Sequence, residues 1–179
     1  MPRNRRPQDR DEKRDEIVRA AELLFTRDGF AETPLSKVAS AAGVTTNTIY
    51  WYFADKDALL VGVLDRVLHE ALAEAAALPD RPWDEQLLWA LARLQRYHRL
   101  VTVVHARANS SKVIDSWHTG FHDLADAMLV EGFREAGAAE DDLLLRAQLA
   151  VFVIEGLLMH PHDESAARSM LRLLVPTAS

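Results

Sequence analysis

The stretch from Thr33 to Lys56 constrains the fold of this chain more than any other; it reads TPLSKVASAAGVTTNTIYWYFADK. Thr33 and Pro34 predict a helix start, because a hydroxyl can cap free N–H groups and a proline loses no bond in the first turn. Gly43 can take the positive φ that a tight turn between two helices needs. Thr45 is the predicted cap of a short second helix. This order of signals predicts a helix-turn-helix.

Apolar and polar side chains separate cleanly in these two predicted helices. The residues expected to face the core are Leu35, Val38, Ala39, Ala42, Val44, Ile49 and Phe53. The side chains left to point elsewhere are Thr46, Asn47, Thr48 and Trp51. Asn and Thr are mediocre helix formers, so their presence at an exposed helix start suggests selection for contact with a partner.

Helical periodicity continues on both sides of this motif, and the sequence contains no strand pattern, internal repeat or low-complexity tract. A helix over 11–28 is predicted to end at Gly29, and a long helix begins near Asp55 and Lys56. Further helices are predicted over 83–99, 112–136, 142–159 and from Asp163 or Ser165 to Leu174. The prediction is an all-α chain of about nine helices, in which a three-helix helix-turn-helix domain (10–55) runs without a linker into a C-terminal helical domain (56–179).

The charge distribution favours the N-terminal part as the one that meets an anion. The formal net charge is −6, but residues 1–60 hold ten basic and ten acidic side chains, so the whole excess of acid lies downstream. Arg3, Arg5 and Arg6 stand between two prolines in a segment, 1–9, that we expect to be a mobile basic arm. Such an arm is either a solvated tail or reaches phosphates or a minor groove.

Several classes of protein are excluded or disfavoured. The chain has no cysteine, and therefore no disulfide framework, thiolate metal site or cysteine nucleophile. No run is long and apolar enough for a membrane span, and the basic start has no apolar segment behind it, so we expect a cytoplasmic protein without a signal peptide. Nucleophile elbow, zinc signature, phosphate loop and paired catalytic carboxylates are all missing, so an enzyme is not expected, and no cofactor is predicted.

The motif resembles the DNA-binding domain of the TetR family of bacterial transcriptional regulators. The resemblance is carried by Ala41-Ala42-Gly43-Val44-Thr45, by Thr48-Ile49-Tyr50-Trp51-Tyr52-Phe53, and by Lys56 and Leu59; the preceding helix matches through Ala20-Ala21, Leu24-Phe25 and Gly29-Phe30. It covers about residues 14–64. The chain departs from the family at Asn47, where Gly or Ala is frequent, and at Tyr52, where His is frequent.

The resemblance implies a homodimer that binds a palindromic operator in double-stranded DNA. Its base-reading residues would be Thr45, Thr46, Asn47 and Thr48, of which Asn47 is the best candidate because an amide pairs bidentately with adenine. Phosphates would be held by Tyr50, Tyr52 and Lys56, with added backbone contacts from Thr33 and Lys37. Trp51 completes this predicted DNA-binding set. Tyr50 could instead seal the turn from inside.

The resemblance further implies that the C-terminal helices bind a small-molecule effector and form the dimer. The predicted interface, on helices 112–136 and 142–159, consists of Leu129, Phe133, Phe152, Val153 and Leu157, with Gly132 and Gly156 allowing close approach. The predicted effector site, between the long connecting helix and helices 83–99 and 112–136, consists of Trp89, Arg93, Tyr97, His98, Trp117, His118, Phe121, His122 and Met128. For most of these residues, ordinary core packing is an equal or better explanation.

Two alternatives stay open at this level. His118 and His122 are four residues apart, a spacing that can bind a metal from one helix face, but no Glu lies between them and the sequence indicates no third ligand, so no metal is predicted. The protein could also be a helix-turn-helix dimer that a protein partner regulates, or one that binds DNA without an effector. The leading interpretation is a repressor that a small molecule releases from its operator.

Overall fold

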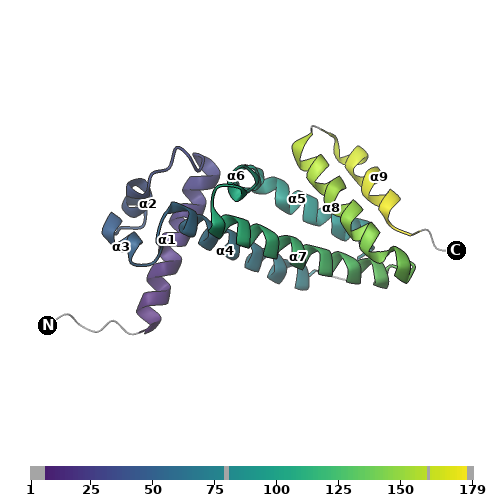
Figure 1. Ribbon diagram of the computed structural model, residues 1–179, viewed down its shortest axis with the longest axis horizontal. Helices are drawn as coiled ribbons and strands as arrows, with labels where there is room; N and C mark the ends of the chain where they lie inside the picture. Colours follow the sequence, from purple (N-terminus) through teal and green to yellow (C-terminus); the bar gives the residue numbers. More distant parts are fainter. Residues whose placement is uncertain (1–6, 79–80, 161, 177–179) are drawn as a thin grey trace. The chain divides into compact units, whose positions relative to one another are not determined.

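The computed structural model describes residues 7–78, 81–160 and 162–176, and these residues are helical with short connections (Figure 1). The α-helices in chain order are α1 (Pro7–Arg27), α2 (Leu35–Ala41), α3 (Thr46–Tyr50), α4 (Lys56–Ala76), α5 (Trp83–Arg96), α6 (His98–Ala108), α7 (Lys112–Glu135), α8 (Leu143–Met159) and α9 (Glu164–Leu174). A 3-10 turn, Glu140–Asp142, precedes α8. The all-α prediction is confirmed.

Helix boundaries differ from the prediction at two places. The predicted arm, 1–9, ends sooner, because Pro7–Asp9 already belong to α1; Arg3, Arg5 and Arg6 lie outside the described residues. The predicted helix over 83–99 ends at Arg96, and a further helix that was not among those predicted, α6, follows it. No helix in the described ranges is long and apolar enough to cross a membrane.

The chain divides into two compact units. The first contains the described residues up to Ala76 together with Arg99–Trp117, and the second contains Ala77–His98 and the described residues from His118 onward. The chain therefore passes between the units three times, once inside α7.

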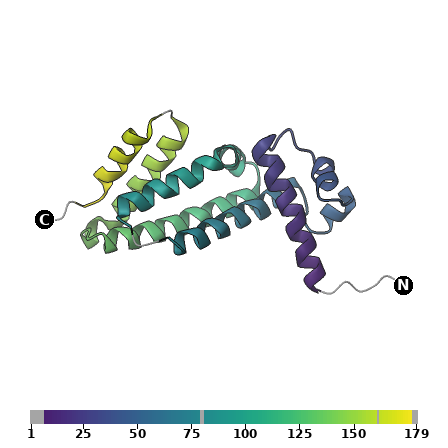
Figure 2. The ribbon, with the colours of Figure 1, turned by 180° about the vertical axis from the view of Figure 1, so that it is seen from behind.

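The core of the first unit is built where α1 packs against α4 and α2 packs against α1 and α3 (Figure 2). The buried residues include the predicted anchors Val38, Ile49 and Phe53, with Ile17 and Phe25 from α1. Gly43 has φ +62° between α2 and α3, as the turn requires. The predicted helix-turn-helix is therefore present, with its apolar residues inside.

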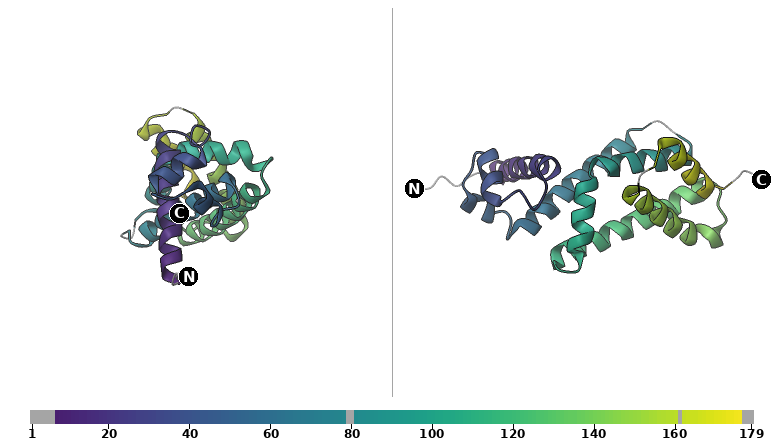
Figure 3. Two further views of the ribbon diagram at one scale, coloured as in Figure 1. Left: turned by 90° about the vertical axis from the view of Figure 1, so that its left-hand side faces the viewer. Right: turned by 90° about the horizontal axis from the view of Figure 1, so that it is seen from above.

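The core of the second unit joins α5, α7, α8 and α9, and α8 and α9 lie side by side (Figure 3). Asp163 caps α9, as predicted, by accepting a hydrogen bond of 2.7 Å from the Ala166 N–H. Leu129, Phe133 and Leu157 are at most 8% exposed and belong to this core. Their side chains are already covered within one chain, so Phe152, which is exposed, and Val153, which is half-buried, are the members of the predicted interface set that remain accessible.

Gly132 of α7 serves the packing inside the second unit. The Trp83 ring lies so close that a Cβ at position 132 would fall 2.1 Å from its Cη2 atom. The same ring meets Phe133 edge to face, with centroids 5.8 Å apart. The missing side chain at 132 therefore makes room for an indole of the same chain.

We predict that Gly132→Ala destabilises the second unit while Gly120→Ala does not. Both glycines lie inside α7, where alanine gains about 1 kcal/mol of helix propensity. At 132 the clash with Trp83 should cost about 1–3 kcal/mol and outweigh this gain, whereas a Cβ at 120 meets nothing within 4 Å. Denaturant unfolding of both variants is the measurement. Equal stability of the two variants would contradict the packing described here.

Candidate functional site

The candidate site is the exposed side of α3 and the residues that follow it. Asn47, Tyr50 and Trp51 are exposed, Trp51 to 81%, while Thr46 and Tyr52 are half-buried. The Asn47 side chain is exposed, so its amide is accessible to a partner. Tyr50 is 54% exposed and does not seal the turn from inside. An amide, a phenol and an indole are thus presented together beside one short helix.

Thr45 and Thr48 fix the start of α3. The Thr45 hydroxyl oxygen accepts a hydrogen bond of 3.2 Å from the Thr48 N–H, which makes Thr45 the N-cap, as predicted. The two hydroxyls also lie 3.0 Å apart and bond to one another. Both threonines are therefore engaged in holding the helix end, and Asn47 becomes the most available base-reading candidate in this turn.

Thr33 does not take the role that the sequence predicts. Its side chain is fully buried, and its hydroxyl donates a hydrogen bond of 2.7 Å to the Gly29 carbonyl. α2 instead begins after Pro34, without a side-chain cap. The hydroxyl closes the turn between α1 and α2, so a contact from it to a DNA backbone is not compatible with this structure.

Lys37 is exposed at the same turn and forms an ion pair with Asp28, with 2.8 Å between Nζ and Oδ2. Arg27 also donates hydrogen bonds of 2.6 and 2.8 Å to that carboxylate. The hydrogen bonds from Arg27 and then Lys37 hold the pKa of Asp28 well below its ordinary value. Asp28 therefore stays ionised and offsets part of the positive charge that Lys37 would offer to a phosphate.

Lys56, predicted to hold a phosphate, turns its ammonium inward. Its Nζ donates to the Phe30 carbonyl and lies 4.2 Å from the centroid of the Phe30 ring. Burial, and then the charge of Arg107, lower the pKa of Lys56. The ammonium fastens the first turn of α4 to the segment after α1, and this leaves little of its charge for an external partner.

Asp57 ties the same turn of α4 to α6 within the first unit. Arg107 donates two hydrogen bonds to its carboxylate, Nε to Oδ1 at 2.9 Å and Nη2 to Oδ2 at 2.7 Å. The guanidinium also lies 5.5 Å from the centroid of the Phe30 ring. This bidentate pair joins residues fifty positions apart, which is why no sequence pattern indicated it.

The predicted effector residues are divided between the two units. Trp117 belongs to the first, where its Nε1 donates a hydrogen bond of 2.8 Å to Asp65. In the second unit, Trp89 is half-buried, Met128 is nearly half exposed and His98 is exposed. Arg93 is only 7% exposed, and its guanidinium lies 5.1 Å from the centroid of the Tyr97 ring. Arg93 is the most buried basic side chain among the predicted effector residues.

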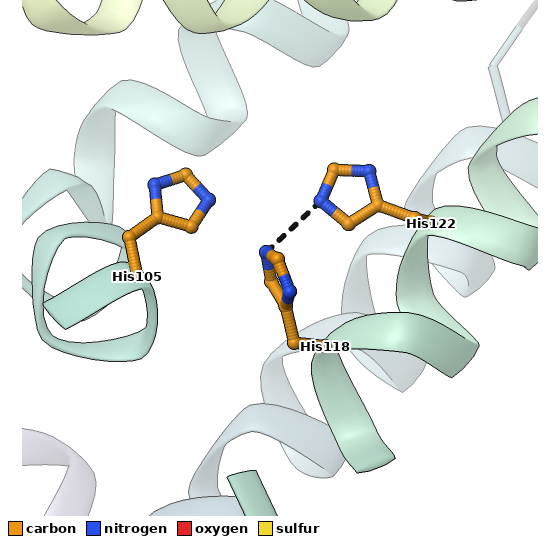
Figure 4. Close-up of side chains that lie close together, drawn as sticks. All are labelled: His105, His118 and His122. Atoms are coloured by element: carbon orange, nitrogen blue, oxygen red, sulfur yellow. Dashed lines mark hydrogen bonds between the residues drawn. The ribbon is translucent and has the colours of Figure 1, made fainter. Parts of the chain in front are cut away.

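His118, Phe121 and His122 come together on α7 in the second unit. The two imidazoles are hydrogen-bonded, with 3.0 Å between their Nε2 atoms, and the Phe121 ring lies 5.7 Å from that of His122. Figure 4 shows the imidazoles of His118 and His122 turned toward one another; the third ring drawn, that of His105, belongs to the first unit. The sequence did not indicate that Glu155 of α8 also lies 3.6 Å from His122.

Comparison with known proteins supports the resemblance of the N-terminal motif. The family model described as "Bacterial regulatory proteins, tetR family" matches residues 17–63. The HTH-type transcriptional regulator TtgR of Pseudomonas putida is 41% identical over 71 residues, 38% of this chain and 34% of TtgR. This chain therefore spans about a third of the length of the first curated relatives it matches.

Two further matches extend beyond the motif. The HTH-type transcriptional regulator EthR of Mycobacterium tuberculosis is 29% identical over 152 residues, 78% of this chain and 70% of EthR. The crystal structure of a putative transcriptional regulator from Saccharomonospora viridis in complex with choline has a TM-score of 0.72 and 19% identity, over 90% of this chain and 94% of its own. The second match shows that the two chains share a fold.

We predict that Asp57→Asn removes stability at neutral pH but not at low pH. Burial alone would raise the pKa of Asp57, yet the hydrogen bonds from Arg107 and Ser111 outweigh it and the net shift is downward. A lowered pKa in the folded state gives stability that is present above the unfolded-state value and lost as pH falls through the folded-state value. The free energy of unfolding should fall by about 1–2 kcal/mol at pH 7.

The measurement is denaturant unfolding between pH 2.5 and 7. The difference between wild type and Asp57→Asn should shrink as the pH falls below about 4. Asp115→Asn, the same chemical change at an exposed position of α7, is the matched control. A difference that stayed constant across this range would contradict the role assigned to the Arg107–Asp57 pair.

Proposed function

Because this chain belongs to the TetR family of bacterial regulatory proteins, we propose that it is a homodimeric DNA-binding transcriptional regulator, a repressor that a small molecule releases from its operator. The observation that carries the proposal is the exposed amide and aromatic pair of Asn47, Tyr50 and Trp51 on a helix-turn-helix with a buried apolar side. Exposed aromatic side chains on a short helix do not contribute to the packing of the unit, but they can contact the groove and the backbone of a nucleic acid.

In this proposal α3 enters the major groove and Asn47 reads a base. At adenine, the Asn47 amide can donate a hydrogen bond to N7 and accept one from the N6 amino group. No other base offers this pair of groups in the major groove, which makes Asn47 the specificity residue. Tyr50, Trp51 and Tyr52 contact the sugar-phosphate backbone on either side. Thr45 and Thr48 act mainly by fixing the helix end, and Lys56 by fixing the first turn of α4.

The partner of the second unit is a second copy of this chain, bound to the outer face of α8 and α9. Along α8 the residues Leu145, Leu149, Phe152, Gly156 and Met159 recur at helical spacing on one side. Phe152 is 70% exposed, and Leu173 of α9 is 84% exposed. Exposed apolar side chains on two adjacent helices are costly in water, and pairing these helices with those of a second copy about a two-fold axis would cover both copies at once.

The effector is an organic anion with an apolar or aromatic portion. Arg93 is a nearly buried cation stacked on Tyr97, and such a group favours a carboxylate over a cation. The Saccharomonospora viridis protein was crystallised with choline, an organic cation, so this chain would differ from that neighbour in the charge of its ligand.

Effector binding would act through the first turn of α4. Arg107 joins α6 to Asp57, next to Lys56 and only four residues after Phe53, the anchor that follows α3. A shift of α6 would therefore move the first turn of α4, which directly follows the helix-turn-helix, through the bidentate contact between Arg107 and Asp57. Coupling between two such sites is typically worth about 1–3 kcal/mol.

We predict that Asn47→Ala relaxes sequence discrimination at one base pair of each half-site by about 1–3 kcal/mol. An operator would first be selected from random DNA with the purified protein, and affinities would then be measured at several salt concentrations. The dependence on salt should not change, because phosphate contacts are retained. Asn109→Ala, at an exposed asparagine after α6, is the control. Absence of salt-sensitive, sequence-specific binding by the wild type would refute the proposed function.

We predict that Phe152→Glu converts a dimer into a folded monomer. The side chain is exposed in the single chain, so the fold should tolerate the change, whereas an unpaired charge in an apolar interface is strongly unfavourable. Sedimentation velocity across a dilution series is the measurement, with helicity from circular dichroism as the check on folding. Leu23→Glu on α1, at a residue that is 60% exposed, controls for the added charge. A variant that stayed dimeric at every concentration would rule out this face.

A further inference from the structure

His122 has two metal-ligating neighbours in the second unit. His118 and His122 lie on successive turns of α7, and their Nε2 atoms are 3.0 Å apart (Figure 4). Glu155, on α8, places Oε1 3.6 Å from the Nε2 atom of His122. The side chains of His122 and Glu155 are 28% and 35% exposed, so an ion could enter from solvent. Two helices of one unit therefore supply two ring nitrogens and a carboxylate oxygen.

The spacing of two of the three atom pairs matches what a metal ion requires. Zinc ligands lie about 2.0–2.2 Å from the ion, so neighbouring ligand atoms of a tetrahedral site are about 3.3–3.6 Å apart. The separations of 3.0 Å between His118 and His122 and 3.6 Å between His122 and Glu155 are within a few tenths of an ångström of this range. Both pairs share the Nε2 atom of His122, so closing the site requires the His118 ring and the Glu155 carboxylate to turn toward each other around one ion.

The chemical types of the three groups also favour binding of a divalent metal ion. Neutral imidazole nitrogens are preferred ligands of zinc, copper and nickel, and a carboxylate adds the negative charge that a dication needs. Without an ion, the two Nε2 atoms can face each other only when one of them carries the proton. An ion would accept lone pairs from both nitrogens at once, and the carboxylate would offset part of its charge.

We propose that His118, His122 and Glu155 form a binding site for a divalent transition-metal ion of the zinc class, with one coordination position left open. Three protein ligands and an open position characterise zinc sites that bind a further molecule, whereas structural sites use four protein ligands. A water molecule, or a small molecule with a chelating group, completes the shell. This site stands on its own geometry and does not depend on the proposed regulation of DNA binding.

The test is a titration of tag-free protein, pretreated with a chelator, with Zn²⁺ in competition with a chromophoric indicator. The wild type should bind one ion per chain. His118→Gln and His122→Gln should each weaken binding at least about tenfold, and Glu155→Gln should do the same, because a shell with two protein ligands holds the ion poorly. His160→Ala, which removes an exposed histidine after α8, should bind like the wild type.

Two further readouts separate a site from nonspecific binding or misfolding. Co²⁺ in place of zinc should give the intense visible absorption of a tetrahedral ion in the wild type and lose it in His122→Gln. Thermal unfolding without metal should show that the glutamine variants remain folded, and Zn²⁺ should raise the unfolding temperature of the wild type alone. Wild-type binding weaker than about 1 mM, or glutamine variants that bind as the wild type does, would overturn the proposal.

Discussion

Five residues cannot hold an α-helix in water, so α3 depends entirely on what surrounds it. Ile49 is fully buried, Phe53 is nearly so, and the Thr45 hydroxyl closes the first turn. These three contacts settle the rotation of the helix about its own axis. Asn47, Tyr50 and Trp51 face outward only because the two apolar side chains face inward. The surface that we propose reads DNA is thus specified by residues that cannot touch it.

Local signals in the sequence were enough to predict this part of the structure. The apolar spacing of α2 and α3, the turn at Gly43 and the caps at Thr45 and Asp163 involve residues within four positions of one another. Such contacts form wherever the backbone is helical, and they depend little on the rest of the fold. The sequence therefore predicted the helices and the buried side of the motif, as well as its exposed residues.

Contacts between distant residues could not be predicted in the same way. Lys56 has a long side chain, and nothing near it in sequence indicates that its ammonium reaches the Phe30 carbonyl, twenty-six residues away. Thr33 had two acceptable uses, as a helix cap or as a donor to the turn, and both fit its sequence position. Glu155 meets His122 only because α7 and α8 belong to one unit. α8 is apolar on most sides, so periodicity could not separate Leu157, in the core, from Phe152, outside it.

The contrast between Trp51 and Trp83 has an optical consequence. Trp51, 81% exposed beside α3, is open to a soluble quencher such as iodide. Trp83 is half-buried, wedged against Gly132 and Phe133 with its indole nitrogen buried, and there the same quencher has less access. The first tryptophan belongs to the unit that carries the helix-turn-helix, and the second to the other unit. Each unit also contains a second tryptophan, Trp117 in the first and Trp89 in the second, so variants that keep Trp51 or Trp83 alone would allow loosening of one unit to be followed separately from events at the other.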